Sequence, residues 1–298
     1  MKNEANLGSE SVGKLLFKLS LPAIVAQLIN VMYNMVDRMY IGHIPNVGAS
    51  ALTGVGVTMP VIMAISAFAA LVSMGGAPRS SIMMGKNDKQ HAEQILGNCT
   101  ILLFALALIL TIVFMLYGKS ILMLFGASDT TIGFAWDYMR IYTLGTLFVQ
   151  ISLGLNAFIT SQGYAKTSMM TVLIGACCNI ILDPIFIFPL QMGVQGAAIA
   201  TILGQMASFA VSAAYLRHFK SVDMKKSCLR LDNAICRRVL GLGISSFITQ
   251  LSITVVMGVS NNLLTTYGAQ SVYGAEIPLT AMGIVMKVNQ ILISILVG

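Results

Sequence analysis

The chain has 298 residues, of which 56% are hydrophobic and only 10% are charged, and its formal net charge is +7. A soluble domain has about 25% charged residues, and the mean hydropathy of +0.82 points away from a water-soluble fold. The composition therefore excludes a secreted disulfide scaffold, a disordered tail and an ordinary cytosolic enzyme, and it predicts an all-α polytopic membrane protein.

Eight apolar runs are long enough to cross a bilayer, which requires about 20 mostly apolar residues per helix. Gly, Pro, Asn and Lys interrupt the sequence between these runs and indicate loops. Residues 120–125, after the third run, are amphipathic and predict a short helix at the membrane interface. In chain order the predicted spans are 15–40, 51–73, 95–116, 135–160, 168–188, 194–216, 239–267 and 278–298.

The first span carries four polar residues on one face. Gln27, Asn30, Asn34 and Asp37 follow one another at steps of three and four residues, so they lie within about 80° of one another on a helix. This polar stripe must face protein or water rather than lipid. Pro22 lies one to two turns before the stripe, removes a backbone hydrogen bond and predicts a hinge. The alternative is that Asp37 is simply solvated at the helix end, which the aligned amides disfavour.

The fifth span contains a second buried acid. Asn179 and Asp183 are four residues apart and share a helix face. Pro184 follows directly and frees a backbone carbonyl that could serve as a ligand. A carboxylate at the centre of a bilayer costs about 2.5–3.5 kcal/mol, so we interpret Asp37 and Asp183 as functional residues.

Two further polar faces could close a cavity around these acids. The alternative is that their hydroxyl groups bond only to their own helices or join neighbouring helices. In the fourth span Tyr138 and Asn156 are eighteen residues apart, which is about five helical turns, and Tyr142 adds to the same face. In the sixth span the shared face holds Thr201, Gln205, Ser208 and Ser212.

The methionine and cysteine residues bear on what the protein binds. The chain has 20 methionines, and this flexible, polarisable side chain suits surfaces that bind diverse ligands. The five cysteines include no CxxC pair, so neither a zinc site nor a redox pair is predicted, and we expect no bound cofactor. Candidates for a substrate pocket are Met32, Met35, Met59 and Met63, for which packing in the core or against lipid is the alternative.

The sequence repeats itself weakly. Residues 19–28 align with 242–251, and residues 52–56 align with 279–283. Six spans per copy give both copies the same orientation, which predicts a parallel repeat about an axis along the membrane normal. We expect a six-helix lobe over 1–216, a basic cytoplasmic linker over 217–238, and a partial second lobe of two helices over 239–298, truncated inside an apolar run.

The distribution of Lys and Arg predicts the orientation in the membrane. With the N-terminus in the cytoplasm, the inner segments hold nearly all the basic residues outside the spans, whereas the outer loops hold Lys119 alone. Cytoplasmic loops carry this excess of positive charge. We therefore expect a multi-pass protein of the plasma membrane, in contact with lipid. We also expect a monomer. No nucleic-acid partner is expected, since no domain-sized basic face exists.

At these residues the sequence resembles the multidrug and toxic compound extrusion (MATE) family, in its DinF-like branch. The resemblance covers essentially the whole chain. It depends on Pro22 with Asp37 fifteen residues later, on the inner loop 79–88, on the segment 179–184, and on residues 193–198 at the start of the sixth span.

The resemblance implies twelve helices in two six-helix lobes, and antiport of an organic cation or lipophilic drug against H⁺ or Na⁺. It implies that the cation site lies in the first lobe, and it matches Pro22 to the proline of helix one. The family's acidic residues match Asp37 and Asp183, and their amide and hydroxyl partners match Asn179, Thr201, Asn156 and Tyr138.

The sequence thus predicts a cation-coupled drug antiporter, which is not an enzyme, with H⁺ or Na⁺ as the coupling ion. Bound Na⁺ would have Asp37, Asp183, Asn179 and Thr201 as oxygen ligands. A flippase for lipid-linked saccharides from the same superfamily is the main alternative, although such a cavity would need more basic residues to meet phosphate. An intramembrane aspartyl protease built on the two acids and a seven-helix receptor are weaker alternatives.

Overall fold

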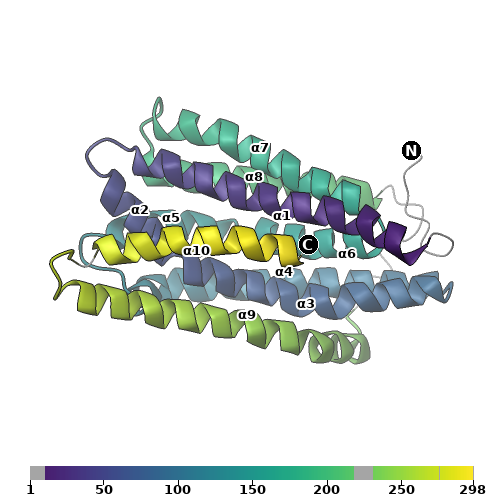
Figure 1. Cartoon of the computed structure of the whole chain (residues 1–298). Helices are drawn as coiled ribbons and strands as arrows, with labels where there is room; N and C mark the ends of the chain where they lie inside the picture. Colours follow the sequence, from purple (N-terminus) through teal and green to yellow (C-terminus); the bar gives the residue numbers. More distant parts are fainter. Residues whose placement is uncertain (1–10, 218–230, 275, 298) are drawn as a thin grey trace.

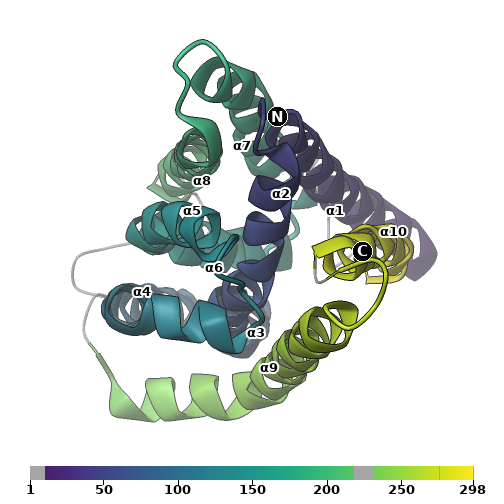
Figure 2. The same cartoon turned by 90° about the vertical axis from the view of Figure 1, so that its left-hand side faces the viewer.

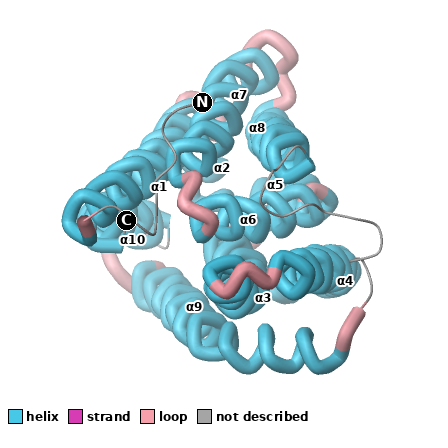
Figure 3. Tube along the Cα trace, turned by 90° about the vertical axis from the view of Figure 1, so that its right-hand side faces the viewer, coloured by secondary structure: helices cyan, strands magenta, loops and turns pink. Residues whose placement is uncertain are grey.

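The computed structural model describes residues 11–217, 231–274 and 276–297, and no strand occurs in these parts of the chain. They form an elongated helical bundle (Figures 1 and 3). The helices in chain order are α1 (Val12–Gly42), α2 (Gly48–Val57), α3 (Met59–Gly85), α4 (Lys89–Leu124), α5 (Ile132–Leu144), α6 (Thr146–Ser161), α7 (Ala165–Ile187), α8 (Gly193–Arg217), α9 (Asn233–Gly268) and α10 (Glu276–Val297).

The membrane spans agree with the sequence-based prediction. Six helices in the described residues are long and apolar enough to cross a membrane, and the bent pair of α5 and α6 adds a seventh. In α10, the eighth predicted span, Ile277–Met286 is a shorter apolar helix. One local prediction is wrong: residues 120–124 form no separate surface helix, because α4 continues without interruption to Leu124.

Two predicted spans are interrupted. The second contains α2 and α3, which meet at Thr58, with Pro60 in the first turn of α3. The fourth is bent by 59° between α5 and α6. At this bend Gly145 lies so close to the side chain of Ile202 that a Cβ atom would clash with it. Glycine therefore allows the chain to turn against α8.

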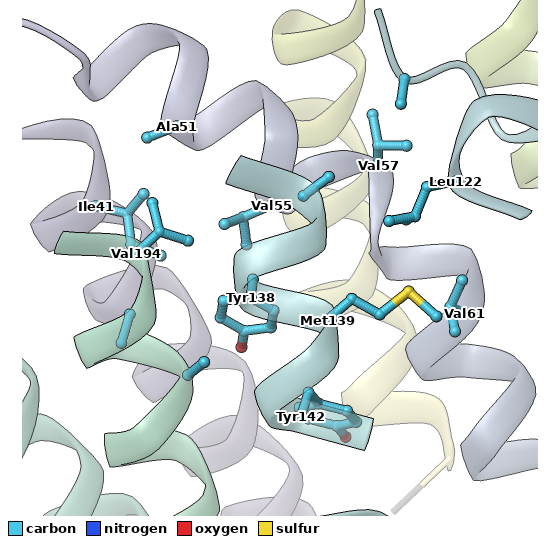
Figure 4. Packing of buried hydrophobic residues seen from close by; sticks show 14 of the residues in the cluster. Ile41, Ala51, Val55, Val57, Val61, Leu122, Tyr138, Met139, Tyr142 and Val194 are labelled. Atoms are coloured by element: carbon cyan, nitrogen blue, oxygen red, sulfur yellow. The ribbon is translucent and has the colours of Figure 1, made fainter. Parts of the chain in front are cut away.

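Side-chain packing and capping hold the helices in place. One buried cluster lies around α2, α5 and the start of α3, and it includes Val55, Tyr138 and Met139 (Figure 4). A second lies between α3, α4 and α6 around Leu103 and Phe158. At the start of α4, Asp88 accepts a hydrogen bond from the backbone N–H of His91 (3.1 Å), which lowers the pKa of Asp88.

Helices α9 and α10 pack against the other eight along two seams. Helix α9 lies along α3 and α4, and α10 lies beside α1 and α2 (Figure 2). Helix α9 begins at Asn233, inside the range 217–238 that the sequence assigned to a linker. Residues 218–230 of that range lie outside the described residues.

Candidate functional site

The two acids that the sequence singled out meet inside the bundle. Asp37 lies on α1 and is 6% exposed, and Asp183 lies on α7 and is fully buried. Helices α1 and α7 pack along each other, and the two carboxyl groups lie close enough to interact directly. Two carboxyl groups this close in a low-dielectric interior carry a single negative charge far more readily than two. We call Asp37 and Asp183 the acid pair.

An amide and a hydroxyl group extend the site onto α8. The Nδ2 atom of Asn179 donates to Oδ1 of Asp183 (3.2 Å) and to Oγ1 of Thr201 (3.4 Å). Asn179 and Thr201 are buried. The other two oxygens of this group, Oδ1 of Asn179 and Oδ2 of Asp183, are buried without a hydrogen-bond partner. Buried acceptors of this kind are costly unless a proton or a cation meets them.

The packing of α7 against α8 brings Asn179 to Thr201. A Cβ on Gly204 would lie 2.7 Å from the carbonyl oxygen of Gly175, and one on Gly175 would lie 2.9 Å from the carbonyl oxygen of Gly204. Only glycine at both positions allows the two backbones to come this close.

The polar stripe of α1 leads from the acid pair toward the N-terminal end of that helix. The Nδ2 atom of Asn34 donates to Oδ1 of Asn30 (3.0 Å), and both residues are partly buried. Gln27 is exposed, whereas Asp37 is buried, so exposure rises along the stripe. Pro22 is buried within α1, which continues through it as one helix.

Tyr138 is the part of the predicted fourth-span face that reaches the acids. It is buried on α5, its hydroxyl group lies near Thr201, and it lies within electrostatic range of Asp37. Its ring stacks on that of Tyr142, with centroids 6.2 Å apart and an interplanar angle of 16°. Figure 4 shows both tyrosines on α5.

Asn156 does not join this group. The hydroxyl group of Thr171 donates to its side-chain oxygen (3.0 Å). Thr171 and Asp183 are twelve residues apart on α7, which is about 18 Å along a helix. The argument that Asn156 and Tyr138 share one helix face is wrong, because the bend between α5 and α6 separates them.

The polar face of α8 divides in the same way. Thr201 and Gln205 face the acid pair, whereas Ser208 accepts a hydrogen bond from Ser152 of α6 (3.0 Å). Ser208 thus joins two helices, which is the alternative that the sequence left open. Ser212 is buried further along the helix.

One residue of the site escaped the sequence analysis. Tyr33 lies near Asn34 and Gln205 and within electrostatic range of both acids. Its position four residues before Asp37, on the same helix face, was the available signal.

The four methionines lie on two different helices. Met32 and Met35 on α1 are 63% and 38% exposed. Met59 and Met63 on α3 are half-buried. Helix α1 packs mainly on α7, whereas α3 packs mainly on α9, so the contacts do not unite the four in one surface. In the described residues no group of three or more His, Cys, Asp or Glu could hold a metal ion.

Comparison with known proteins agrees with this arrangement. The sequence profile of the MatE family matches residues 22–185. Multidrug export protein MepA of Staphylococcus haemolyticus is 27% identical over 259 residues, which are 87% of this chain and 57% of that relative. A FAD transporter of Shewanella oneidensis is 27% identical over 237 residues, which are 78% of this chain and 51% of that relative. The solved structure of the MATE multidrug transporter DinF-BH, a complex with a ligand, superposes with a TM-score of 0.90 at 30% identity, covering 99% of this chain and 64% of that one.

These matches and the membrane-length helices define a multi-pass membrane protein of a transporter family. The chain belongs to the MatE family, the family of MATE efflux transporters. The resemblance found in the sequence is thereby confirmed, as is the all-helical fold. The chain spans about half the length of the curated relatives it matches.

Proposed function

We propose that this protein exports lipophilic or cationic drugs across the cytoplasmic membrane by antiport against H⁺ or Na⁺. The observation that carries the proposal is the acid pair with its two buried, unpartnered oxygens on Asn179 and Asp183. A site of this kind attracts one positive charge and has no counter-charge for a second. Drug and coupling ion would therefore compete for the same acids, and competition is what couples two fluxes.

The site residues divide this work. The acid pair takes up a proton, or Na⁺ with Asn179 and Thr201 as further oxygen ligands. The polar stripe of α1 provides the hydrated approach from its exposed end at Gln27. Neutralisation of Asp37 removes the reason for the stripe to face water, and Pro22 provides the place where α1 bends. Met32, Met35, Met59 and Met63 stay substrate-pocket candidates, on two separate walls.

The two-lobe organisation and the orientation are part of the proposal. Thr53 and Thr280 hold equivalent places in the two sequence copies, and their hydroxyl oxygens are 2.9 Å apart. Equivalent residues meet when a two-fold axis passes between them, which supports a parallel repeat with lobes 1–216 and 239–298. The excess of Lys and Arg in the loops at one end of the bundle supports a cytoplasmic N-terminus.

The proposed substrates follow the names of the relatives. MepA is named a multidrug export protein, and DinF-BH is named a multidrug transporter. The DinF-like branch is supported by the latter match and by the acids in the first six helices. The comparisons do not favour the flippase alternative, and the acid pair would repel a phosphate group. The transporter is proposed to act as a monomer surrounded by lipid.

The test measures proton release when the purified 298-residue chain binds ethidium in weak buffer. For H⁺ coupling we expect the parent protein to release protons on binding, and Asp37→Asn to abolish the release. Asp137→Asn is the matched control, because Asp137 lies at the surface beside Arg140 (3.1 Å). Na⁺ coupling instead predicts binding without proton release and competition by Na⁺ that Asp37→Asn removes. Ethidium binding that neither ion nor mutation affects would contradict the proposal.

A further inference from the structure

An ion pair lies on the lipid-facing side of α5. Asp137 and Arg140 are joined at 3.1 Å, and their side chains are 36% and 42% exposed. Gly133, four residues before Asp137, and Leu144, four residues after Arg140, are exposed on the same helix face. Because α5 belongs to a membrane span and Leu144 is 63% exposed, this face meets the bilayer. Charged groups that face lipid are costly, and the acid pair makes no use of these two.

The backbone of Arg140 lies deeper in the membrane than a charged residue favours. The hydroxyl group of Thr111 on α4 donates to the carbonyl oxygen of Thr143 (3.2 Å), which fixes the register between α4 and α5. Arg140 is three residues from Thr143, and Lys119 is eight residues from Thr111, which are about 4.5 Å and 12 Å along a helix. The Cα atom of Arg140 therefore lies about 7 Å deeper than that of Lys119, level with exposed apolar residues of α4.

Two further side chains complete a polar corner between α4 and α5, which lie side by side (Figure 2). The indole ring of Trp136 lies against the backbone of α4, since a Cβ on Gly118 would lie 2.5 Å from it. The Nζ atom of Lys119 is 5.8 Å from the centroid of this ring. Tryptophan is enriched at the membrane–water interface, so the ring places the corner at the depth of the lipid headgroups. We call Lys119, Trp136, Asp137 and Arg140 the α4–α5 corner.

We propose that the α4–α5 corner binds the headgroup of a phospholipid that carries both a phosphate and a primary ammonium group, as phosphatidylethanolamine does. Lys119 and Arg140 supply positive charge for the phosphate, and Asp137 supplies a carboxylate for the ammonium group. Hydrogen bonds between ionised groups are stronger than those between neutral ones. The acyl chains would lie on exposed apolar residues of α4, among them Ile112 and Leu116.

The charges at the corner predict which headgroup binds best. Phosphatidylglycerol has a phosphate but no positive charge, so Asp137 would face a like charge without compensation. Phosphatidylcholine has a quaternary ammonium group, which has no N–H to donate to the carboxylate. The inference does not depend on the proposed function, because the corner is on the lipid side of α5, whereas Tyr138 lies on the side of the acid pair. Changes at the corner should leave ethidium binding as it is.

The experiment uses Trp136, the single tryptophan of the chain, as the probe. The purified full chain in dodecylmaltoside is titrated with phospholipids whose acyl chains carry bromine, which quenches indole fluorescence on contact. We expect half-maximal quenching at about a three- to tenfold lower mole fraction of phosphatidylethanolamine than of phosphatidylcholine or phosphatidylglycerol. Asp137→Asn should remove the preference over phosphatidylcholine and strengthen the binding of phosphatidylglycerol.

Two further variants test the phosphate contacts. Lys119→Gln combined with Arg140→Gln should weaken all three lipids about tenfold or more. Lys89→Gln removes an exposed charge at the other end of α4, and this matched control should behave like the parent. Brominated dodecylmaltoside should quench Trp136 equally in every variant, which shows that the ring keeps its exposure. Quenching in the parent that is equal or stronger with phosphatidylcholine or phosphatidylglycerol, or an ethanolamine preference that survives Asp137→Asn, would overturn the inference.

Discussion

At the scale of single residues, the site depends on which polar groups lie at the same depth along neighbouring helices. Asn179 and Asn156 are chemically identical and lie on neighbouring helices, yet only Asn179 contacts the acid pair. Asn179 donates both of its described hydrogen bonds inside the site, to Asp183 and to Thr201. It therefore holds Asp183 in place, and in the proposed mechanism it offers its own unpartnered oxygen to a bound cation.

This difference predicts the effect of removing each amide. Asn179→Ala leaves a buried carboxyl group without its donor, and the loss of such a bond costs about 1–3 kcal/mol. We expect ethidium affinity to fall about fivefold to a hundredfold in a fluorescence titration. Asn156→Ala is the matched control and should change affinity less than about twofold. Equal losses in the two variants would show that the site extends along the whole of α6.

At the scale of helices, small residues decide how closely two segments approach. Helices α7 and α8 meet backbone to backbone at Gly175 and Gly204, and Asn179 lies one turn beyond Gly175. Gly145 permits the bend that turns α5 toward the acids and α6 away from them. The position of each polar group thus depends on glycines elsewhere in the sequence.

A methyl group at Gly204 should separate α7 from α8. In Gly204→Ala the new Cβ would lie 2.7 Å from a backbone oxygen that cannot turn aside. We expect a loss of about 1–3 kcal/mol in stability, seen as a lower Tm, together with weaker ethidium binding. Gly241→Ala in α9 is the control, because nothing lies within 4 Å of its Cβ. A helical alanine in open space should be neutral or stabilising, and an unchanged Tm for Gly204→Ala would refute the packing argument.

At the scale of the whole molecule, the two seams differ in construction. The α3–α9 seam is tight, since a Cβ on Gly243 would strike the carbonyl oxygen of Leu71 and one on Gly75 would strike that of Val239. Asn98 ties the start of α9 to α4 by accepting from the backbone N–H of Asp232 (2.7 Å). The contact of α10 with α1 and α2 instead contains the Thr53–Thr280 hydrogen bond and the half-buried Arg38. The first seam thus brings backbone against backbone, whereas the second is joined through side chains.

The tight seam predicts a strong effect from a larger side chain. Gly243→Leu should force α9 away from α3, lower the Tm and increase hydrogen exchange along α9. The expected cost is about 1–3 kcal/mol or more, because backbone atoms stand in the way. Gly241→Leu places the same side chain two residues away in open space and should leave both measurements unchanged. Normal exchange in Gly243→Leu would mean that α9 can leave α3 at little cost.

The sequence by itself determined the membrane class, the order of the spans, the two acids and the family. These follow from properties of single segments, since hydropathy, helical spacing and the cost of a buried carboxylate need no knowledge of neighbours. Only the tertiary structure brought Asp37 to Asp183, added Tyr33 and separated Asn156 from the site. Those outcomes depend on glycines and bends that decide which parts of two neighbouring helices face each other. The periodicity of residues within one helix does not say which helix packs against it.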